Sequence, residues 1–361
     1  MRIAVVDLVC IQGGGYSVLK SLFEYVVSGM SKDHKWLFIV SRQKFESNAY
    51  VKVIHFPNAA SGYLQRVKTE WLEVNKVLND FVPDIVLSMP NIRVFGCKWK
   101  QAVYMQQSLP FQKEKKFSFL KKEERSCAFR QHIQGLIIRK SLKKSEMVFV
   151  QTEWVKCALE ECIRNRPIIK IGYPADQIGS SFAAQTKELN RAFFYPASPY
   201  IYKNHRAIFA AIKILRKKGY SLKVYLTLNL SDLGTGGNQY AELSDVIECI
   251  GQQSKAQMRE LYARTTLVFP SYIETVGLPL AEARAAGAWI IASDCPFSHE
   301  VLEGYPNCEY FDPFNATQLA DCMERVITGR VVWRSIPYTG DTNENCWDKM
   351  MMCLARESDT K

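Results

Sequence analysis

Two glutamates flank a short loop in the second half of the chain. Glu274 and Glu282 lie eight residues apart, and Gly277-Leu278 stands between them, where a loop is expected to end and a helix to begin. The first N–H groups of a helix attract anions, and carboxylates accept hydrogen bonds from hydroxyl groups. A nucleotide sugar, with ribose on one side of its diphosphate and a second sugar on the other, fits this arrangement. Glutamates at this spacing are also common as plain surface charge, so the pair alone leaves both interpretations open.

A second candidate site is the run Gly13-Gly14-Gly15, which follows the first expected strand and opens the first expected helix. Glycine lets an anionic group approach the backbone at a helix N-terminus. A tight turn would explain the same residues. The run lacks the G-x-G-x-x-G spacing and the later acidic residue of a dinucleotide site, so we do not expect an NAD site.

The elements that would position these residues follow from hydrophobic patterning. A helix is expected over residues 62–80, where apolar side chains recur every three or four positions: Leu64, Val67, Trp71, Val74 and Leu78. It lies among short apolar strands expected at residues 2–7, 36–40, 51–56, 84–87, 101–104 and 147–150. Strands that alternate with helices predict a parallel sheet covered on both faces.

The same alternation restarts after residues 175–190, a polar, aperiodic stretch typical of a linker. We therefore predict a first domain at 1–174 and a second at 191–340, an α/β protein with two doubly wound, Rossmann-like domains. Folds of this kind bind ligands at the carboxyl ends of their strands, so we expect the site in a cleft between the two domains.

The amino-acid composition excludes several classes of protein. The chain has 361 residues, of which 47% are hydrophobic and 23% charged, which excludes a disordered or collagen-like chain. The cysteines number eleven, an odd count, are widely spread and form no C-x-x-C pair, so we expect free thiols in a reduced cytoplasm. We expect no signal peptide and no membrane-spanning segment. We also expect no metal site, because the sequence has no Asp-x-Asp and His34, His55, His132 and His299 form no ligand set.

The net charge of +11 is concentrated in one segment. Between Lys113 and Glu146 there are eleven Lys or Arg against four Glu, a net +7, with aromatic and aliphatic residues between them. The segment, residues 113–144 in particular, suits an anionic membrane surface or phosphates. A solvated helical face would have the same composition.

Residues 247–304 resemble the donor-binding region of family 4 retaining glycosyltransferases, which have the GT-B fold. The likeness rests on Pro270-Ser271, the Glu-x7-Glu pair, the Gly-Leu-Pro between its members, and the later Asp312-Pro313. Weaker likeness extends over all but the tail of the chain. It implies that residues 341–361 form a C-terminal helix that crosses back onto the first domain.

This resemblance gives the candidate residues their roles. Glu274 and Lys203 would be catalytic, Glu274 contacting the donor sugar and Lys203 neutralising the phosphates. Glu282 would hold the ribose hydroxyls, and the amides of Gly277 and Leu278 would face the diphosphate. We add Gly14, Gly15 and Asn204 on the donor side, and Gln106 and Gln107 on the acceptor side.

The sequence departs from the family pattern at two positions. Ala197 stands where an Arg is usual six residues before Lys203, and the candidates to replace that cation are Tyr200, Asn204 and His205. Gln106 stands near the usual position of a His. Glutamine orients an acceptor but takes no proton from it. In the mechanism proposed for the family, the leaving phosphate itself accepts that proton.

The function expected from the resemblance is transfer of a sugar, with retention, from a UDP- or GDP-linked donor to a glycan or lipid-linked glycan. Lipopolysaccharide O-antigen or capsule assembly is the expected setting, and the inner face of the cytoplasmic membrane the expected location. The alternative is a sugar-nucleotide epimerase on the same fold. A nucleic-acid binder would rest on charge alone, and no recognised motif accompanies it.

Overall fold

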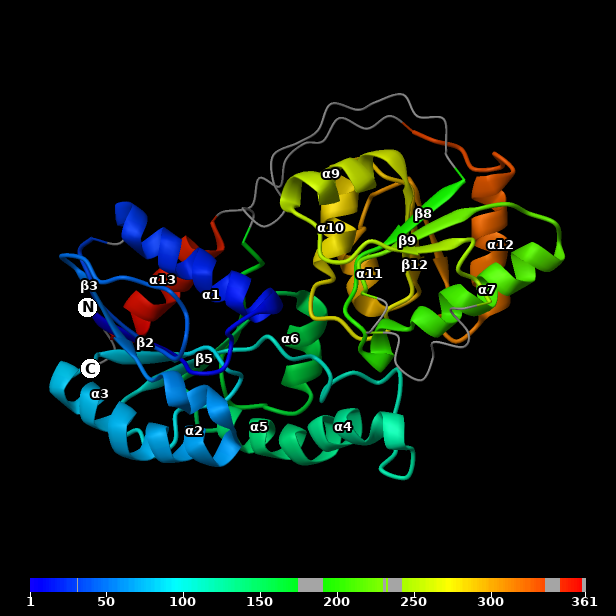
Figure 1. The fold of residues 1–361 in the computed structure, drawn as a ribbon. Coiled ribbons are helices and arrows are strands. Elements are labelled where there is room, and N and C mark those ends of the chain that lie inside the picture. The colour runs from blue at the N-terminus through cyan, green and yellow to red at the C-terminus, as the bar shows by residue number, and fades with distance from the viewer. Residues whose placement is uncertain (31, 175–190, 230–231, 233–241, 335–344, 359–361) are drawn as a thin grey trace. The chain divides into compact units, whose positions relative to one another are not determined.

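The computed structural model describes residues 1–30, 32–174, 191–229, 232, 242–334 and 345–358. It divides into two compact units, each built on one sheet (Figure 1). The described part of unit 1 is residues 1–30, 32–119, 125–174 and 345–358, and that of unit 2 is residues 120–124, 191–229, 232 and 242–334. The linker expected at residues 175–190 lies outside the described residues.

Unit 1 has a seven-stranded parallel sheet in the order β3-β2-β1-β4-β5-β6-β7. Its strands are β1 (Arg2–Asp7), β2 (Lys35–Val40), β3 (Val51–His55), β4 (Ile85–Ser88), β5 (Gln101–Tyr104), β6 (Met147–Val150) and β7 (Ile168–Lys170). β1 is in register with β2 and β4 on its two sides, with Val5 opposite Phe38 and Leu87. The central strands are buried on both faces, which explains their continuous apolar sequences.

Helices cover both faces of this sheet. They are α1 (Gly13–Tyr25), α2 (Tyr63–Thr69), α3 (Asn75–Phe81), α4 (Arg125–Ala128), α5 (Gly135–Leu142), α6 (Glu153–Glu160) and α13 (Cys346–Ser358). Single π-helical turns, η3 (Glu70–Val74) and η5 (Phe129–Gln134), join α2 to α3 and α4 to α5 into continuous helices over residues 63–81 and 125–142. Two more short turns of this unit are η1 (Val26–Met30) and η2 (Pro57–Ser61), whereas the short turn η4 (Lys122–Glu124) belongs to unit 2.

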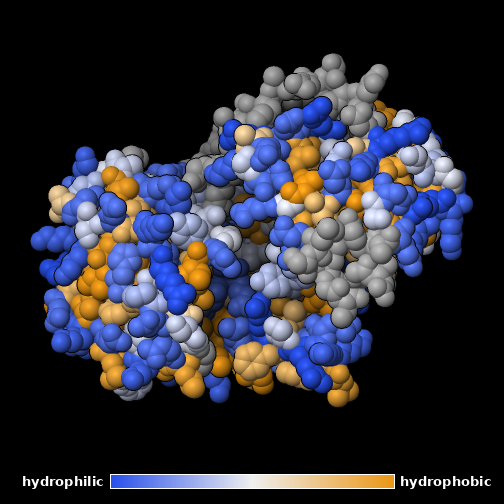
Figure 2. Space-filling model, viewed as in Figure 1, coloured by the Kyte–Doolittle hydropathy of each residue, from blue (hydrophilic) through white to orange (hydrophobic). Residues whose placement is uncertain are grey.

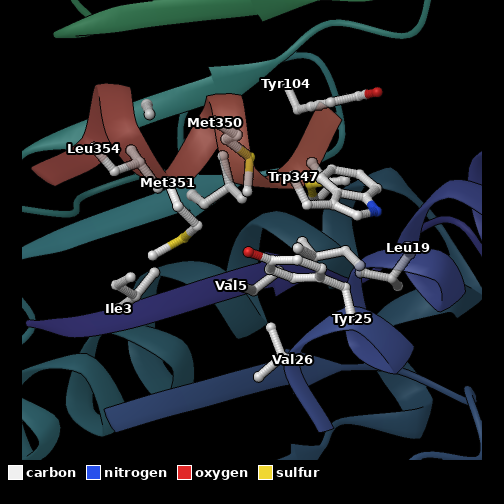
Figure 3. Close-up of a cluster of buried hydrophobic side chains, with 14 of the residues drawn as sticks. Ile3, Val5, Leu19, Tyr25, Val26, Tyr104, Trp347, Met350, Met351 and Leu354 are labelled. Carbon is white, nitrogen blue, oxygen red and sulfur yellow. The ribbon is translucent and has the colours of Figure 1, made fainter. Parts of the chain in front are cut away.

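The C-terminal helix α13 packs beside α1 on one face of the unit 1 sheet, as the fold prediction required (Figure 3). Trp347, Met350 and Leu354 are each at most 2% exposed and contact a core that includes Val5 and Tyr104. The Tyr25 hydroxyl of α1 donates to Asp348 at 2.5 Å. The last segment of the chain therefore completes the core formed by the first.

The opposite face of the sheet carries the helices over residues 63–81 and 125–142. Val74 and Leu78 pack on β1, β2 and β4, whereas Ile138 and Leu142 pack on β5 and β6. Because β4 and β5 are adjacent, the two helices are neighbours on this face (Figure 1).

In the helix over residues 63–81, the residues that face the core are not the ones that the apolar spacing predicts. Leu64 and Trp71 are 84% and 61% exposed, and the inward positions include Glu70, which is 1% exposed. Glu70 accepts from Arg66 at 2.6 Å and from the backbone N–H of Phe95 at 3.1 Å. This buried polar pair holds the loop after β4, and leaves the two apolar side chains facing solvent.

Unit 2 has a six-stranded parallel sheet in the order β10-β9-β8-β11-β12-β13. Its strands are β8 (Ala192–Tyr195), β9 (Lys223–Leu226), β10 (Ile247–Cys249), β11 (Thr266–Phe269), β12 (Ile290–Ser293) and β13 (Cys308–Phe311). Its helices are the short η7 (Ile201–Lys203), α7 (His205–Lys217), α9 (Lys255–Arg264), α10 (Leu278–Ala285), α11 (Pro296–Val301) and α12 (Ala316–Ile327). α7 packs with α12, and α10 packs with α9 and α11 (Figure 1). The predicted fold class, α/β with two parallel, Rossmann-like sheets, is confirmed.

Candidate functional site

The candidate site lies at the carboxyl edge of the unit 2 sheet, where the loops after β8 and β11 meet. Lys203 ends the first loop and Glu274 lies in the second. Lys203 Nζ donates to Glu274 Oε1 at 2.5 Å, and the two side chains are 16% and 14% exposed. Two largely buried charges in contact depend on each other, because removal of one leaves the other without its partner in a poorly solvated place.

The backbone of Lys203 is held by groups around it. The hydroxyl of Tyr195 donates to the Lys203 carbonyl at 2.7 Å. Asn204 has a φ of 60°, in the left-handed region that asparagine tolerates better than most residues. Its Nδ2 donates to the carbonyls of Pro313 at 2.7 Å and Pro270 at 3.3 Å, which joins the loops after β8, β11 and β13. Asn204, predicted to bind the donor, thus commits its amide nitrogen to the scaffold.

Gly277 and Leu278 lie where the β11 loop turns into α10. Gly277 has a φ of 79°, a conformation that favours glycine, and a Cβ there would be in tight contact, 3.3 Å from Leu280 and 3.4 Å from Phe297. No side chain caps α10 at Gly277, and Pro279 lacks an N–H. The amides at the start of the helix therefore offer an anion the positive end of the helix dipole.

Glu282 lies in the second turn of α10 and is held by a residue from α9. The hydroxyl of Tyr262, 2% exposed, donates to Glu282 Oε2 at 2.6 Å. Burial raises the pKa of Glu282, while the bond from Tyr262 and the charges of Lys255 and Arg259 act against that rise. Tyr262 was not singled out in the sequence. Its partner Glu282 lies 13 residues beyond the end of β11, so the local sequence pattern around Tyr262 gives no sign of the contact.

The remaining predicted site residues belong to unit 1. Gly14 and Gly15 lie in the first turn of α1, and a Cβ on Gly15 would lie 2.7 Å from the Cys10 sulfur and 3.4 Å from Gln106 Oε1. Gly15 and Gln106 are therefore neighbours at the carboxyl edge of that sheet. The backbone N–H groups of Gln106 and Gln107 donate to Asn91 Oδ1 at 2.6 and 2.9 Å, which fixes the loop after β5.

Of the three residues considered as substitutes for the missing cation at Ala197, His205 is unsuited. Its ring packs on Tyr195 with 5.0 Å between centroids, and its Nε2 is buried. Burial, and secondly the charge of Lys203, lower the pKa of His205 to about 4. The imidazole is neutral at physiological pH and adds no positive charge for a phosphate.

A pH effect on stability follows from His205. Its folded-state pKa of about 4 lies below the ordinary value of 6.5, so the unfolded chain binds the extra proton first as the pH falls. Stability from this group is therefore fully present above pH 6.5 and is lost between pH 6.5 and 4. We expect His205→Phe to remove up to about 3 kcal/mol of this pH dependence. Urea unfolding at a series of pH values measures it, and a variant with the wild-type slope would contradict the assignment.

Among the described residues, no group of three or more His, Cys, Asp or Glu is placed to hold a metal ion. Within the same ranges, no helix combines the length and the apolar character needed to cross a bilayer.

The region that contains these residues matches a known family model. Residues 182–335 match the family model described as glycosyl transferases group 1. The matched region is less than half of the chain. It contains Lys203, Glu274 and Glu282, the charged residues of the candidate site.

A curated relative and several solved structures resemble the chain more widely. The O-antigen chain mannosyltransferase RfbU of Salmonella typhimurium is 26% identical over 170 residues, which is 46% of this chain and 47% of that protein. The chain therefore matches about half the length of this relative.

Two solved structures show the fold. Sucrose-phosphate synthase from Thermosynechococcus elongatus has a TM-score of 0.70 at 14% identity, with 99% of this chain and 98% of that chain covered. The lipopolysaccharide outer core galactosyltransferase WaaB has a TM-score of 0.63 at 18% identity, with 99% of each chain covered. A UDP-GlcNAc 2-epimerase from Methanocaldococcus jannaschii matches less closely, at a TM-score of 0.55 and 12% identity over 99% of this chain and all of that one. The chain thus has the fold of GT-B glycosyltransferases.

Proposed function

We propose that the chain transfers a sugar from a nucleotide-sugar donor to a glycan or lipid-linked glycan, with retention of configuration at the anomeric carbon. The observation that carries this proposal is the largely buried Lys203–Glu274 pair beside the uncapped start of α10, within the region that matches the family model. A cation, a helix N-terminus and carboxylates on either side of it suit a diphosphate with a sugar at each end.

In this proposal each residue has one task. The Lys203 ammonium, held by Glu274 in the free protein, turns to the diphosphate when the donor binds, and the amides of Gly277 and Leu278 face the same phosphates. Glu282, oriented by Tyr262, accepts hydrogen bonds from the ribose hydroxyls. Glu274, relieved of Lys203, accepts hydrogen bonds from the donor sugar. Charge that develops on the leaving phosphate is thereby stabilised where it forms.

The transfer step needs no side chain as base. The bond between the anomeric carbon and the phosphate oxygen breaks, the acceptor oxygen attacks from the same face, and the leaving phosphate oxygen takes the acceptor proton. Gln106, which carries no base, is proposed to orient the acceptor instead. Diphosphate contacts from Lys203 and the α10 amides would let the site act without a metal ion.

The setting is proposed from the relatives. Because RfbU is an O-antigen chain mannosyltransferase and WaaB a lipopolysaccharide outer core galactosyltransferase, we propose lipopolysaccharide O-antigen or capsule assembly as the pathway. A hexose linked to UDP or GDP is then the donor. The enzyme would work in the cytoplasm at the inner face of the membrane, where a lipid-linked acceptor is exposed, with no role in nucleic-acid binding.

A thermal-shift screen of UDP-, GDP- and ADP-sugars tests the donor. A ligand that binds the native state at a hundred times its Kd raises stability by about 2.7 kcal/mol, so one nucleotide class is expected to raise the melting temperature by several degrees. Glu282→Gln should abolish that rise while Glu248→Gln, on the exposed part of β10, should not. No shift with any nucleotide sugar would count against the proposal.

NMR on the same protein distinguishes a transferase from an epimerase. NMR of the donor without acceptor would show a new sugar isomer for an epimerase. A transferase instead gives an intact donor, and a product of unchanged anomeric configuration once acceptor is added.

A further inference from the structure

Two exposed aromatic side chains lie at the carboxyl edge of the unit 2 sheet. Tyr200 precedes Lys203 by three residues in the loop after β8, and Phe314 lies in the loop after β13. Their exposed fractions are 47% and 56%. A single exposed apolar side chain needs no explanation, but two on loops that meet at a candidate site point to a ligand.

Each exposed ring packs on a second aromatic ring beneath it. The rings of Tyr200 and Tyr202 are stacked, with 5.5 Å between centroids and 5° between their planes. The ring of Phe314 packs on that of Tyr272 with 5.1 Å between centroids, and Tyr272 is 3% exposed. The partner rings hold the exposed ones in place. We call these four residues the aromatic platform.

Hydrogen bonds join the loops that carry the aromatic platform. The backbone N–H of Tyr272 donates to the carbonyl of Tyr202 at 3.1 Å. Asn204 Nδ2 donates to the carbonyl of Pro313 at 2.7 Å, which ties the loop after β13 to the loop after β8. Lys203 Nζ lies 5.8 Å from the centroid of the Tyr202 ring. The platform is therefore one surface beside the charged pair of the candidate site.

The aromatic platform and Glu282 lie toward opposite faces of the unit 2 sheet. α7 and α12 pack together on one face, whereas α9, α10 and α11 cover the other (Figure 1). Right-handed crossovers require this arrangement, because the chain runs from β8 to β9 in one direction and from β11 to β12 in the other. Tyr200 and Phe314 precede α7 and α12, and Glu282 lies on α10. A nucleoside held at Glu282 therefore leaves the platform to the other end of the donor.

We propose that the aromatic platform binds sugar rings of the glycan acceptor. The face of an aromatic ring is negative, and the C–H groups on one face of a pyranose ring are weakly positive, so the two faces attract each other. Two exposed rings on separate loops suit a chain of sugars, whereas the transferred sugar is a single ring assigned to Glu274. The inference rests on the proposed function and names the part of unit 2 that contacts the acceptor.

Other occupants fit this surface less well. A nucleobase also stacks on aromatic rings, but the ribose position at Glu282 places it toward the other face of the sheet. A stable protein partner needs about 800 Å² on each side. The C-terminal end of α7 is hydrophilic, with Arg216, Lys217 and Lys218 exposed, so the aromatic surface does not continue along that helix (Figure 2).

Saturation-transfer NMR of the full chain with trisaccharides of glucose, mannose and galactose tests the inference. At least one trisaccharide should receive saturation at its ring C–H protons and bind more tightly than its monosaccharide. Tyr200→Ala and, separately, Phe314→Ala should each raise the Kd about tenfold. Tyr200→Phe, which keeps the ring, should bind as wild type does. Val332→Ala, at an exposed apolar residue of unit 2 outside the platform, is the matched control and should also bind as wild type does.

Circular dichroism shows whether each variant is folded, and removal of an exposed side chain should leave the fold intact. Tyr200→Ala should also retain the thermal shift with nucleotide sugar. Failure of all three trisaccharides to bind, or wild-type affinity in both alanine variants, would overturn the inference. Loss of the nucleotide shift in Tyr200→Ala would overturn it too, because the platform would then hold the nucleobase. Trisaccharide binding by a chain that shows no shift with any nucleotide sugar would contradict the proposed transferase and leave the platform as a sugar site, so the two failures are distinguishable.

Discussion

Lys203→Met is expected to lower kcat/KM for sugar transfer about a thousandfold. A unit charge about 4 Å from a phosphate at an effective dielectric of about 20 is worth about 4 kcal/mol, and most of it acts on charge that develops as the phosphate leaves. Part of it acts in the ground state, so KM should rise as well as kcat fall. Initial rates with the donor found by thermal shift measure both parameters.

The variant needs controls because Lys203 and Glu274 are buried together. Loss of the ammonium leaves a carboxylate without its partner, so unfolding by urea must show that Lys203→Met is folded at the assay temperature. Lys213→Met is the matched control in the same unit, since Lys213 donates to Glu242 at 2.6 Å but both side chains are exposed. That variant should retain wild-type rates. If Lys203→Met turned over as fast as Lys213→Met, the diphosphate role of Lys203 would be wrong.

Trp347→Ala is expected to destabilise unit 1 by about 3–5 kcal/mol, the range for deletion of a large buried aromatic side chain. Trp347 is 2% exposed, its ring centroid lies 6.0 Å from that of Tyr104, and its Nε1 donates to Ser21 Oγ at 3.1 Å (Figure 3). The substitution opens a cavity between α13, α1 and the sheet and removes a buried hydrogen bond.

Urea unfolding measures this loss of stability. Far-ultraviolet circular dichroism follows the unfolding, because removal of Trp347 would change the fluorescence signal. Two units in one chain can unfold in separate steps, so the transition that shifts identifies the unit that holds α13. Met352→Ala, on the exposed side of the same helix, should change stability by less than about 0.5 kcal/mol. A change below about 1 kcal/mol for Trp347→Ala would mean that α13 contributes little to the unit 1 core.

The parallel sheets were predictable because their strands are buried on both faces. β1 and β4 are continuous apolar runs, and no polar residue is needed at alternate positions. β7 escaped prediction because it is three residues long, too short for any pattern. The C-terminal helix was expected from the resemblance to GT-B proteins, whereas its partners on α1 lie more than 300 residues away in sequence.

The helix over residues 63–81 shows where periodicity misleads. Leu64 and Trp71 fit the same helical spacing as the buried Val74 and Leu78, and spacing alone assigns them to one face. The inward position belongs to Glu70, because Arg66 and the Phe95 amide satisfy its carboxylate. A long-range polar partner of this kind leaves no trace in the local sequence pattern, and as a result Leu64 and Trp71 are exposed.

Some residues of the candidate site could be predicted from the sequence, whereas the residues that support them could not. Glu274, Gly277 and Glu282 lie in one contiguous stretch, so their order around a helix start was readable. Their supports come from elsewhere: Tyr262 from α9 holds Glu282, and Asn204 holds three loops together. His205 illustrates the limit, because its neutral state depends on burial against Tyr195 rather than on its neighbours in sequence.

The central claim is that a nucleoside diphosphate is held by Lys203 at the start of α10. Calorimetric titration of the nucleotide that gives the largest thermal shift, as diphosphate and as monophosphate, tests it most directly on wild type and on Lys203→Met. Wild type should bind the diphosphate at least about tenfold more tightly than the monophosphate, and this preference should disappear in Lys203→Met. An unchanged preference in Lys203→Met would contradict the claim.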